Sequence, residues 1–169
     1  MPWHRPNRFW RHLATDHGSV HRALPAAALA DIEAAIKSGE ATHRGQLCFA
    51  IEPSLPLSRV VARFPPRERA LEVFGQLRVW DTEENCGVLV YLLFADRDVE
   101  IVADRGIHAR VGDGGWEPIC RAMETAFRER RYADGALAGI RAINALLALH
   151  FPGDGRARGN ELPDRPIVL

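Results

Sequence analysis

Apolar residues recur along the chain with spacings typical of helices. After Pro25, they follow the three- and four-residue spacing of an amphipathic helix as far as Gly39, a residue suited to a helix end. The same spacing returns in three later stretches, at 70–77, 116–132 and 134–150. The pattern therefore predicts four helices.

Three shorter stretches have the composition of strands. Residues 46–52 read Gln-Leu-Cys-Phe-Ala-Ile-Glu and are followed by proline. The most apolar stretch, Val88 to Ala95, is too short for a lone buried helix and predicts a central strand covered on both faces. Val99 to Ala103 follows after three residues, a link that allows an antiparallel hairpin but no crossover. The order helix-strand-helix-strand-strand-helix-helix predicts an α/β fold, an α/β/α sandwich with a small mixed sheet.

The two ends of the chain lack such patterns. Residues 1–19 are rich in arginine, histidine and aromatic side chains without a helical or strand period, so we expect a poorly ordered basic and aromatic arm. Residues 153–169 begin with a stretch rich in glycine and charge, which predicts a C-terminal loop and tail. The folded domain is then expected at residues 20–152.

Composition narrows the class of protein. The 169 residues contain 22 Lys+Arg and 22 Asp+Glu, and a chain without net charge is not expected to bind nucleic acid in general. We find no apolar run of about 20 residues and no signal peptide, so no transmembrane segment is expected. The 3 cysteines show no metal-binding or redox spacing. These features predict a cytoplasmic protein in a reducing compartment.

Acidic side chains flank the predicted hairpin. Asp81, Glu83 and Asn85 precede its first strand, and Asp104 follows its second strand. Because the start of one hairpin strand and the end of the other lie at the same end of a sheet, these groups are expected to converge. Oxygen ligands suit Ca²⁺ or Mg²⁺, so Asp81, Glu83 and Asp104 are candidate metal ligands. The alternative is a solvated acidic loop in which Asp104 pairs with Arg105 at the surface.

A second acidic motif lies in the hairpin link. Asp96-Arg97-Asp98 after an apolar strand is similar to the aspartyl-nucleophile signature of haloacid-dehalogenase-type phosphatases. A strand pattern resumes at once from Val99, however, which favours a polar hairpin turn. The chain also lacks the glycine-rich nucleotide loops and the serine or zinc hydrolase motifs, so no organic cofactor is predicted.

The order of several segments resembles the TPM-domain family over roughly residues 29–164. The segments that carry the resemblance are Glu40-Ala-Thr-His-Arg-Gly45, Asn85-Cys-Gly-Val-Leu-Val-Tyr91, Asp104-Arg105-Gly106-Ile107 and Asn160-Glu161-Leu162-Pro163. The resemblance implies an α/β sandwich with a mixed sheet. It also implies a divided function: plant lumenal relatives are linked to photosystem II repair and weak acid-phosphatase activity with a divalent ion, animal relatives modulate membrane proteins, and most bacterial relatives have no assigned reaction.

The family's polar positions can be carried over residue by residue. Besides Asp104, they correspond to a predicted binding cleft of Glu40, Asn85, Asp96, Arg97 and Arg105. Gln46 replaces the acidic residue that the family usually has after the glycine at the strand start, which removes one possible metal ligand.

These observations together favour a bacterial, cytoplasmic TPM-domain protein without signal peptide or membrane anchor. We interpret it as a binding or regulatory module for an unknown protein partner, with an acidic cleft for a divalent cation. The alternative is a metal-dependent phosphomonoesterase of weak activity.

Overall fold

A computed structural model describes residues 5–156 and 159–169 of the chain. Its helices and strands, in chain order, are α1 (Arg5–Ala14), α2 (His17–Ala23), α3 (Ala26–Glu40), β1 (Gln46–Glu52), α4 (Leu57–Val61), α5 (Pro66–Gln76), β2 (Gly87–Leu93), β3 (Asp98–Ala103), α6 (Arg105–Val111), α7 (Asp113–Arg128), α8 (Tyr132–His150) and β4 (Ile167–Val168).

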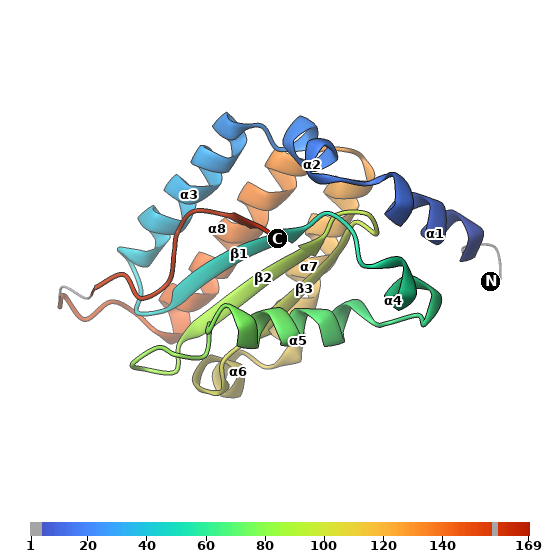
Figure 1. Cartoon of the computed structure of the whole chain (residues 1–169). Coiled ribbons are helices and arrows are strands. Elements are labelled where there is room, and N and C mark those ends of the chain that lie inside the picture. Colours follow the sequence, from blue (N-terminus) through green and yellow to red (C-terminus); the bar gives the residue numbers. More distant parts are fainter. Residues whose placement is uncertain (1–4, 157–158) are drawn as a thin grey trace.

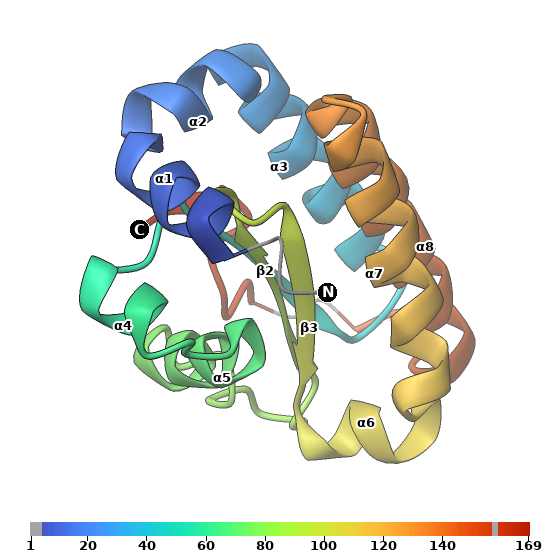
Figure 2. The ribbon, with the colours of Figure 1, turned by 90° about the vertical axis from the view of Figure 1, so that its right-hand side faces the viewer.

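The strands form one mixed sheet between two layers of helices (Figures 1 and 2). The order across the sheet is β3-β2-β1-β4, with β1 parallel to β2 and β4, and β3 antiparallel to β2. Helices α3, α7 and α8 cover one face, and α5 covers the other. The predicted α/β/α sandwich with a small mixed sheet is confirmed.

The two central strands are buried along their whole length because helices cover both of their faces. Every residue of β1 and β2 is buried. Alternate side chains point to opposite faces of a strand: Phe49 and Val90 belong to the core under α3, α7 and α8, whereas Ala50 and Tyr91 belong to the core under α5. Continuous apolar runs in the sequence therefore mark strands with two covered faces.

The predicted hairpin is present. Residues Val88 to Leu93 of β2 pair with Asp98 to Ala103 of β3, and the turn is closed by hydrogen bonds from the Asp96 amide to the Leu93 carbonyl and from the Arg97 amide to the Phe94 carbonyl. Arg97 has a φ of 55°, a left-handed turn conformation. The Asp96-Arg97-Asp98 motif thus forms the end of the turn and the start of β3.

The structure adds elements that the sequence pattern did not predict. The expected helices correspond to α3, α5, α7 and α8, whereas α4, α6 and the short strand β4 are additional. Strand β4 lies within residues 153–169, which were expected to form a C-terminal loop and tail, and it pairs with β1 through Ala50 and Ile51. Two-residue strands and helices of five to seven residues are too short to show a period in the sequence.

The expectation of a poorly ordered N-terminal arm differs from the structure. Residues 1–4 lie outside the described part, but Arg5–Ala14 and His17–Ala23 are helices. Helix α2 begins with a capping box, in which the Asp16 carboxylate accepts a hydrogen bond from the Ser19 amide at 2.8 Å. Arg8, Arg11 and His12 bind α1 to the domain, and polar residues of this kind do not mark a core-facing helix in the sequence.

Gly87 at the start of β2 provides a test of this packing. A Cβ atom at this position would lie 1.9 Å from the carbonyl oxygen of Val79, a backbone atom. Gly87→Ala is therefore expected to lower the free energy of unfolding by about 2–3 kcal/mol, measured by urea denaturation. Gly75→Ala is the matched control, because no atom lies within 4 Å of its Cβ position and alanine favours the helix. Equal stabilities of the two variants would contradict this account.

Candidate functional site at the entry end of the sheet

Strand pairing brings several predicted site residues to one end of the sheet, which we call the entry end. Here β1 and β2 begin at the paired residues Gln46 and Gly87, and β3 ends at Ala103, opposite Val88. The amide of Asp104 donates a hydrogen bond of 2.9 Å to the Gly87 carbonyl, which places Asp104 beside the start of β2.

Asp104 has a buried carboxylate, and one of its two oxygens has no hydrogen-bond partner among the described residues. Its side chain is the N-cap of α6, since Oδ1 accepts a hydrogen bond of 2.6 Å from the Arg105 amide. The residue is 8% exposed, and its Oδ2 atom is buried without a hydrogen-bond partner among the described residues. Burying a carboxylate oxygen without a hydrogen-bond partner is costly, which makes Oδ2 of Asp104 a candidate ligand-binding atom.

Backbone carbonyl oxygens of the loop before β2 lie close to the start of α6. A Cβ atom on Gly106 would lie 2.7 Å from the carbonyl oxygen of Asn85 and 3.4 Å from that of Glu84. Only glycine therefore lets the start of α6 approach these carbonyls so closely. Asn85 adopts a left-handed φ of 51°, which turns the chain just before β2. The start of α6 at the entry end thus has the Asp104 carboxylate as its N-cap and the carbonyl oxygens of Glu84 and Asn85 beside Gly106.

The two other predicted metal ligands take different positions. Asp81 is exposed and pairs with Arg78, three residues earlier. Glu83 is exposed too, and its backbone amide donates to the Glu161 carboxylate at 2.8 Å. Of the residues 5–156 and 159–169, no three or more His, Cys, Asp or Glu side chains form a group that could hold a metal ion. Binding of Ca²⁺ or Mg²⁺ stays a prediction.

A cavity of about 630 Å³ adjoins the start of β1 at the same end. Its lining includes Glu40, His43, Arg44, Gln46 and Asp164. It is linked to the loop before β2 because Arg44 forms an ion pair of 2.7 Å with Glu84. The predicted cleft residue Glu40 therefore lies at the entry end, as do Asn85 and the exposed Arg105.

Among the residues that line this cavity, Glu40 has a strongly shifted pKa. Burial raises its pKa to about 8, and the neighbouring Asp164 carboxylate adds to the increase. The amide of Leu47, which donates to Oε1 at 2.8 Å, acts in the opposite direction. At neutral pH, Glu40 is thus a protonated acid whose side chain hydrogen-bonds with that of Asp164.

Two other polar residues of the cavity have structural partners. Gln46 accepts hydrogen bonds from the amides of Glu161 and Leu162, at 2.9 and 3.3 Å, so it fixes the C-terminal segment. The Nε2 atom of His43 lies 3.0 Å from Oδ1 of Asn144, a residue 101 positions away that local sequence could not identify as its partner. Burial lowers the pKa of His43, which keeps its ring neutral.

Asp96 and Arg97 lie at the opposite end of the sheet, six residues along β2, or about 20 Å away. Asp96 binds Arg8 at 2.9 Å and Arg11 at 3.0 Å, and Nε2 of the buried His12 lies 3.2 Å from it. Burial opposes ionisation of Asp96, but His12 and Arg8 outweigh it and lower the pKa. The structure therefore places these two residues apart from Glu40, Asn85 and Arg105, and Asp96 fastens α1 to the hairpin turn.

The fold and the entry end define a class: an α/β/α protein with a mixed sheet whose polar residues gather where β1 and β2 begin. The family model of the TPM domain, named TPM phosphatase, matches residues 21–146. The match covers more than half of the chain, so the chain belongs to the TPM-domain family, as the sequence resemblance predicted.

Two solved structures support this assignment of the fold. The NMR structure of BA42 protein from the psychrophilic bacterium Bizionia argentinensis is 26% identical, with a TM-score of 0.75, and the alignment covers 86% of this chain and 94% of that one. The solution NMR structure of the N-terminal domain of a protein from P. gingivalis is 20% identical, with a TM-score of 0.65, covering 80% and 83%. No curated protein matches the chain. Helices within the described residues all lack the length or apolarity needed to cross a membrane.

The raised pKa of Glu40 makes a prediction about stability. Its pKa lies at about 8 in the folded protein against an ordinary value of 4.5, so the folded state binds more protons than the unfolded state between these values. Stability should therefore fall as the pH rises from about 4.5 to 8. Glu40→Gln keeps an acceptor for Leu47 and a donor for Asp164, and it should flatten this dependence in thermal melts.

The exposed residue Glu68 supplies the control, since Glu68→Gln removes the same charge from the surface of α5. Melting temperatures of Glu40→Gln that change with pH as steeply as those of Glu68→Gln would contradict the assignment of a protonated Glu40.

Proposed function

We propose that this TPM-domain protein is a binding module that takes a divalent cation at the entry end of its sheet. The observation that carries the proposal is the buried Oδ2 atom of Asp104, which lacks a hydrogen-bond partner within the described part of the chain. The carboxylate of Asp104 and the carbonyl oxygens of Glu84 and Asn85 would hold the cation. A positive ion would supply the charge compensation that this carboxylate oxygen lacks.

The chemistry of the donors favours Ca²⁺ over Mg²⁺. Ca²⁺ accepts carboxylate and backbone carbonyl oxygens in flexible arrangements, whereas Mg²⁺ requires near-octahedral geometry and gives up its water reluctantly. A site with one carboxylate and backbone carbonyls also carries little negative charge, and low ligand charge is typical of weak calcium sites. We therefore expect a dissociation constant closer to millimolar than to nanomolar.

A thermal-shift titration with CaCl₂ tests this proposal. At 100 times the dissociation constant, binding should add about 2.7 kcal/mol, which corresponds to an increase in Tm of roughly 5–10 °C. Asp104→Asn should abolish this shift, because the amide keeps the N-cap acceptor but loses the negative charge. Asp81→Asn is the matched control and should shift like the wild type, since Asp81 pairs with Arg78 at the surface. A calcium-induced increase in Tm that disappears in Asp81→Asn but persists in Asp104→Asn would refute the assignment.

The name of the family model favours a second candidate, a metal-dependent phosphomonoesterase. When bound, a divalent cation supplies a Lewis acid that polarises phosphoryl oxygens. Arg105 begins α6 directly after Asp104 and is exposed, so its guanidinium is available to pair with a phosphate group.

Hydrolysis of para-nitrophenyl phosphate, measured with the same three proteins in CaCl₂ and in MgCl₂, distinguishes the two candidates. Turnover that disappears in Asp104→Asn but persists in Asp81→Asn supports the phosphatase. Equal background rates in all three proteins would exclude the phosphatase. Together with a Tm that depends on calcium, they would support the binding module.

A further inference from the structure

Strand β3 is an edge strand of the sheet, and its outer side faces a groove. Strand β2 occupies one side of β3, so the backbone groups of Val99 and Ile101 point away from the sheet. The Val99 amide donates to Oε1 of Glu124 at 3.3 Å, and the Ile101 carbonyl accepts from Arg67 at 2.6 Å. No other strand of the described residues covers this edge, which side chains alone protect.

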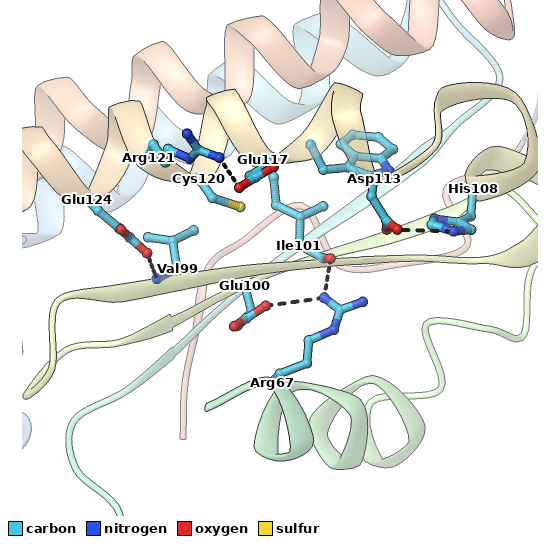
Figure 3. Close-up of a pocket in the computed structure, with 11 residues that line it drawn as sticks. Arg67, Val99, Glu100, Ile101, His108, Asp113, Glu117, Cys120, Arg121 and Glu124 are labelled. Atoms are coloured by element: carbon cyan, nitrogen blue, oxygen red, sulfur yellow. Dashed lines mark hydrogen bonds and ion pairs between the residues drawn. The ribbon is translucent and has the colours of Figure 1, made fainter. Parts of the chain in front are cut away.

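The groove has a volume of about 400 Å³ and runs along β3 between α5 and α7 (Figure 3). Arg67 reaches the strand from α5, while Glu117, Cys120 and Glu124 project from α7 on the other side. Its dimensions and its backbone wall suit an extended chain better than a compact ligand, because the strand offers a donor and an acceptor two residues apart.

Three side chains bind the outward backbone of β3, since Cys120 accepts a hydrogen bond from the Ile101 amide. The other two, Arg67 and Glu124, each have a second partner. Arg67 also binds Glu100 at 3.3 Å, and its side chain is 46% exposed. Glu124 also binds Arg128 at 3.0 Å. Each side chain can therefore release the backbone of β3 without losing all of its interactions, and an incoming strand would replace each lost hydrogen bond by a backbone one.

The wall of the groove contains an unused hydrogen-bond donor. Trp116 lines the groove and is 5% exposed, and its Nε1 atom is buried without an acceptor among the residues described. An indole N–H buried in this way usually has a partner. A peptide carbonyl would be a suitable acceptor for it.

Charge identifies the kind of chain that fits. Four carboxylates line the groove, those of Glu100, Asp113, Glu117 and Glu124. Three arginines pair with them, Arg67 with Glu100, Arg121 with Glu117 and Arg128 with Glu124, so the acidic groups exceed the guanidinium groups by one. An excess of acidic groups attracts basic side chains and repels acidic ones. The same excess opposes a second copy of this chain, because edge-to-edge pairing of two β3 strands would bring two acidic grooves together.

We propose that the β3 groove binds an extended peptide segment rich in lysine or arginine, which adds to the sheet as a further strand beside β3. The peptide backbone pairs with the outward groups of Val99 and Ile101. Its basic side chains pair with Glu117 and Glu124 from α7 and with Glu100 from β3.

The probe is a fluorescein-labelled heptapeptide of alternating lysine and valine, titrated with the full-length protein and followed by fluorescence anisotropy. We expect saturable binding. The same peptide with every lysine replaced by glutamate should not bind. A fully N-methylated lysine peptide keeps the charge but lacks backbone donors, and it should bind at least about tenfold more weakly.

Two protein variants locate the interaction. Glu124→Gln should weaken binding of the lysine peptide about tenfold, whereas Glu129→Gln, beyond the end of α7 and paired with Arg131, should leave it unchanged. Cys120 lines the groove, and burial raises its pKa to about 12, so its alkylation is slow and is followed over hours at pH 8, where the lysine side chains of the peptide keep their charge, by mass spectrometry. Bound peptide should protect Cys120.

Three results would overturn the proposal: equal binding of the N-methylated and unmodified peptides, binding that leaves Cys120 unprotected, or equal losses in Glu124→Gln and Glu129→Gln. Self-association through β3 in sedimentation experiments, without peptide binding, would also overturn it and assign the edge to a second copy.

Discussion

The structure depends on the complete burial of two adjacent parallel strands, β1 and β2, between two layers of helices. Each strand contributes side chains to both cores, so its backbone groups have no access to water and must pair within the sheet. The register in which Gln46 faces Gly87 follows from this requirement, since a shift by one residue would exchange the side chains between the two cores. This register also determines where the polar residues at the ends of β1 and β2 lie.

The polar residues at the two ends of the sheet have different roles. At the turn between β2 and β3, Asp96 is fully engaged by α1 and works as a structural anchor. At the entry end, by contrast, Asp104 keeps a buried oxygen without a partner in the described residues, and Glu40 is protonated beside Asp164. Structural carboxylates are paired with cations or backbone amides, whereas carboxylates left incompletely satisfied mark places where a ligand or a proton completes the site.

Much of the fold could be predicted from the sequence, but only part of the site. A link of three residues between two apolar stretches allows little besides a hairpin, and the hairpin places Asp104 beside the start of β2. Local pairing could not be predicted from the pattern: Asp81 is exposed and pairs with Arg78, three residues earlier. Helix α1 escaped prediction because Arg8 and His12, which hold it, are polar. The pairing of His43 with Asn144 depends on tertiary packing, which a single sequence does not reveal.

The central claim is that the entry end is the ligand site of the domain, and backbone NMR of the ¹⁵N-labelled protein during a calcium titration tests it most directly. The account predicts that the largest changes in amide chemical shift fall in two separate segments, Glu84 to Gly87 and Asp104 to Gly106, and saturate together. Changes confined to the exposed loop at Asp81, or centred on Asp96 at the other end of the sheet, would contradict it.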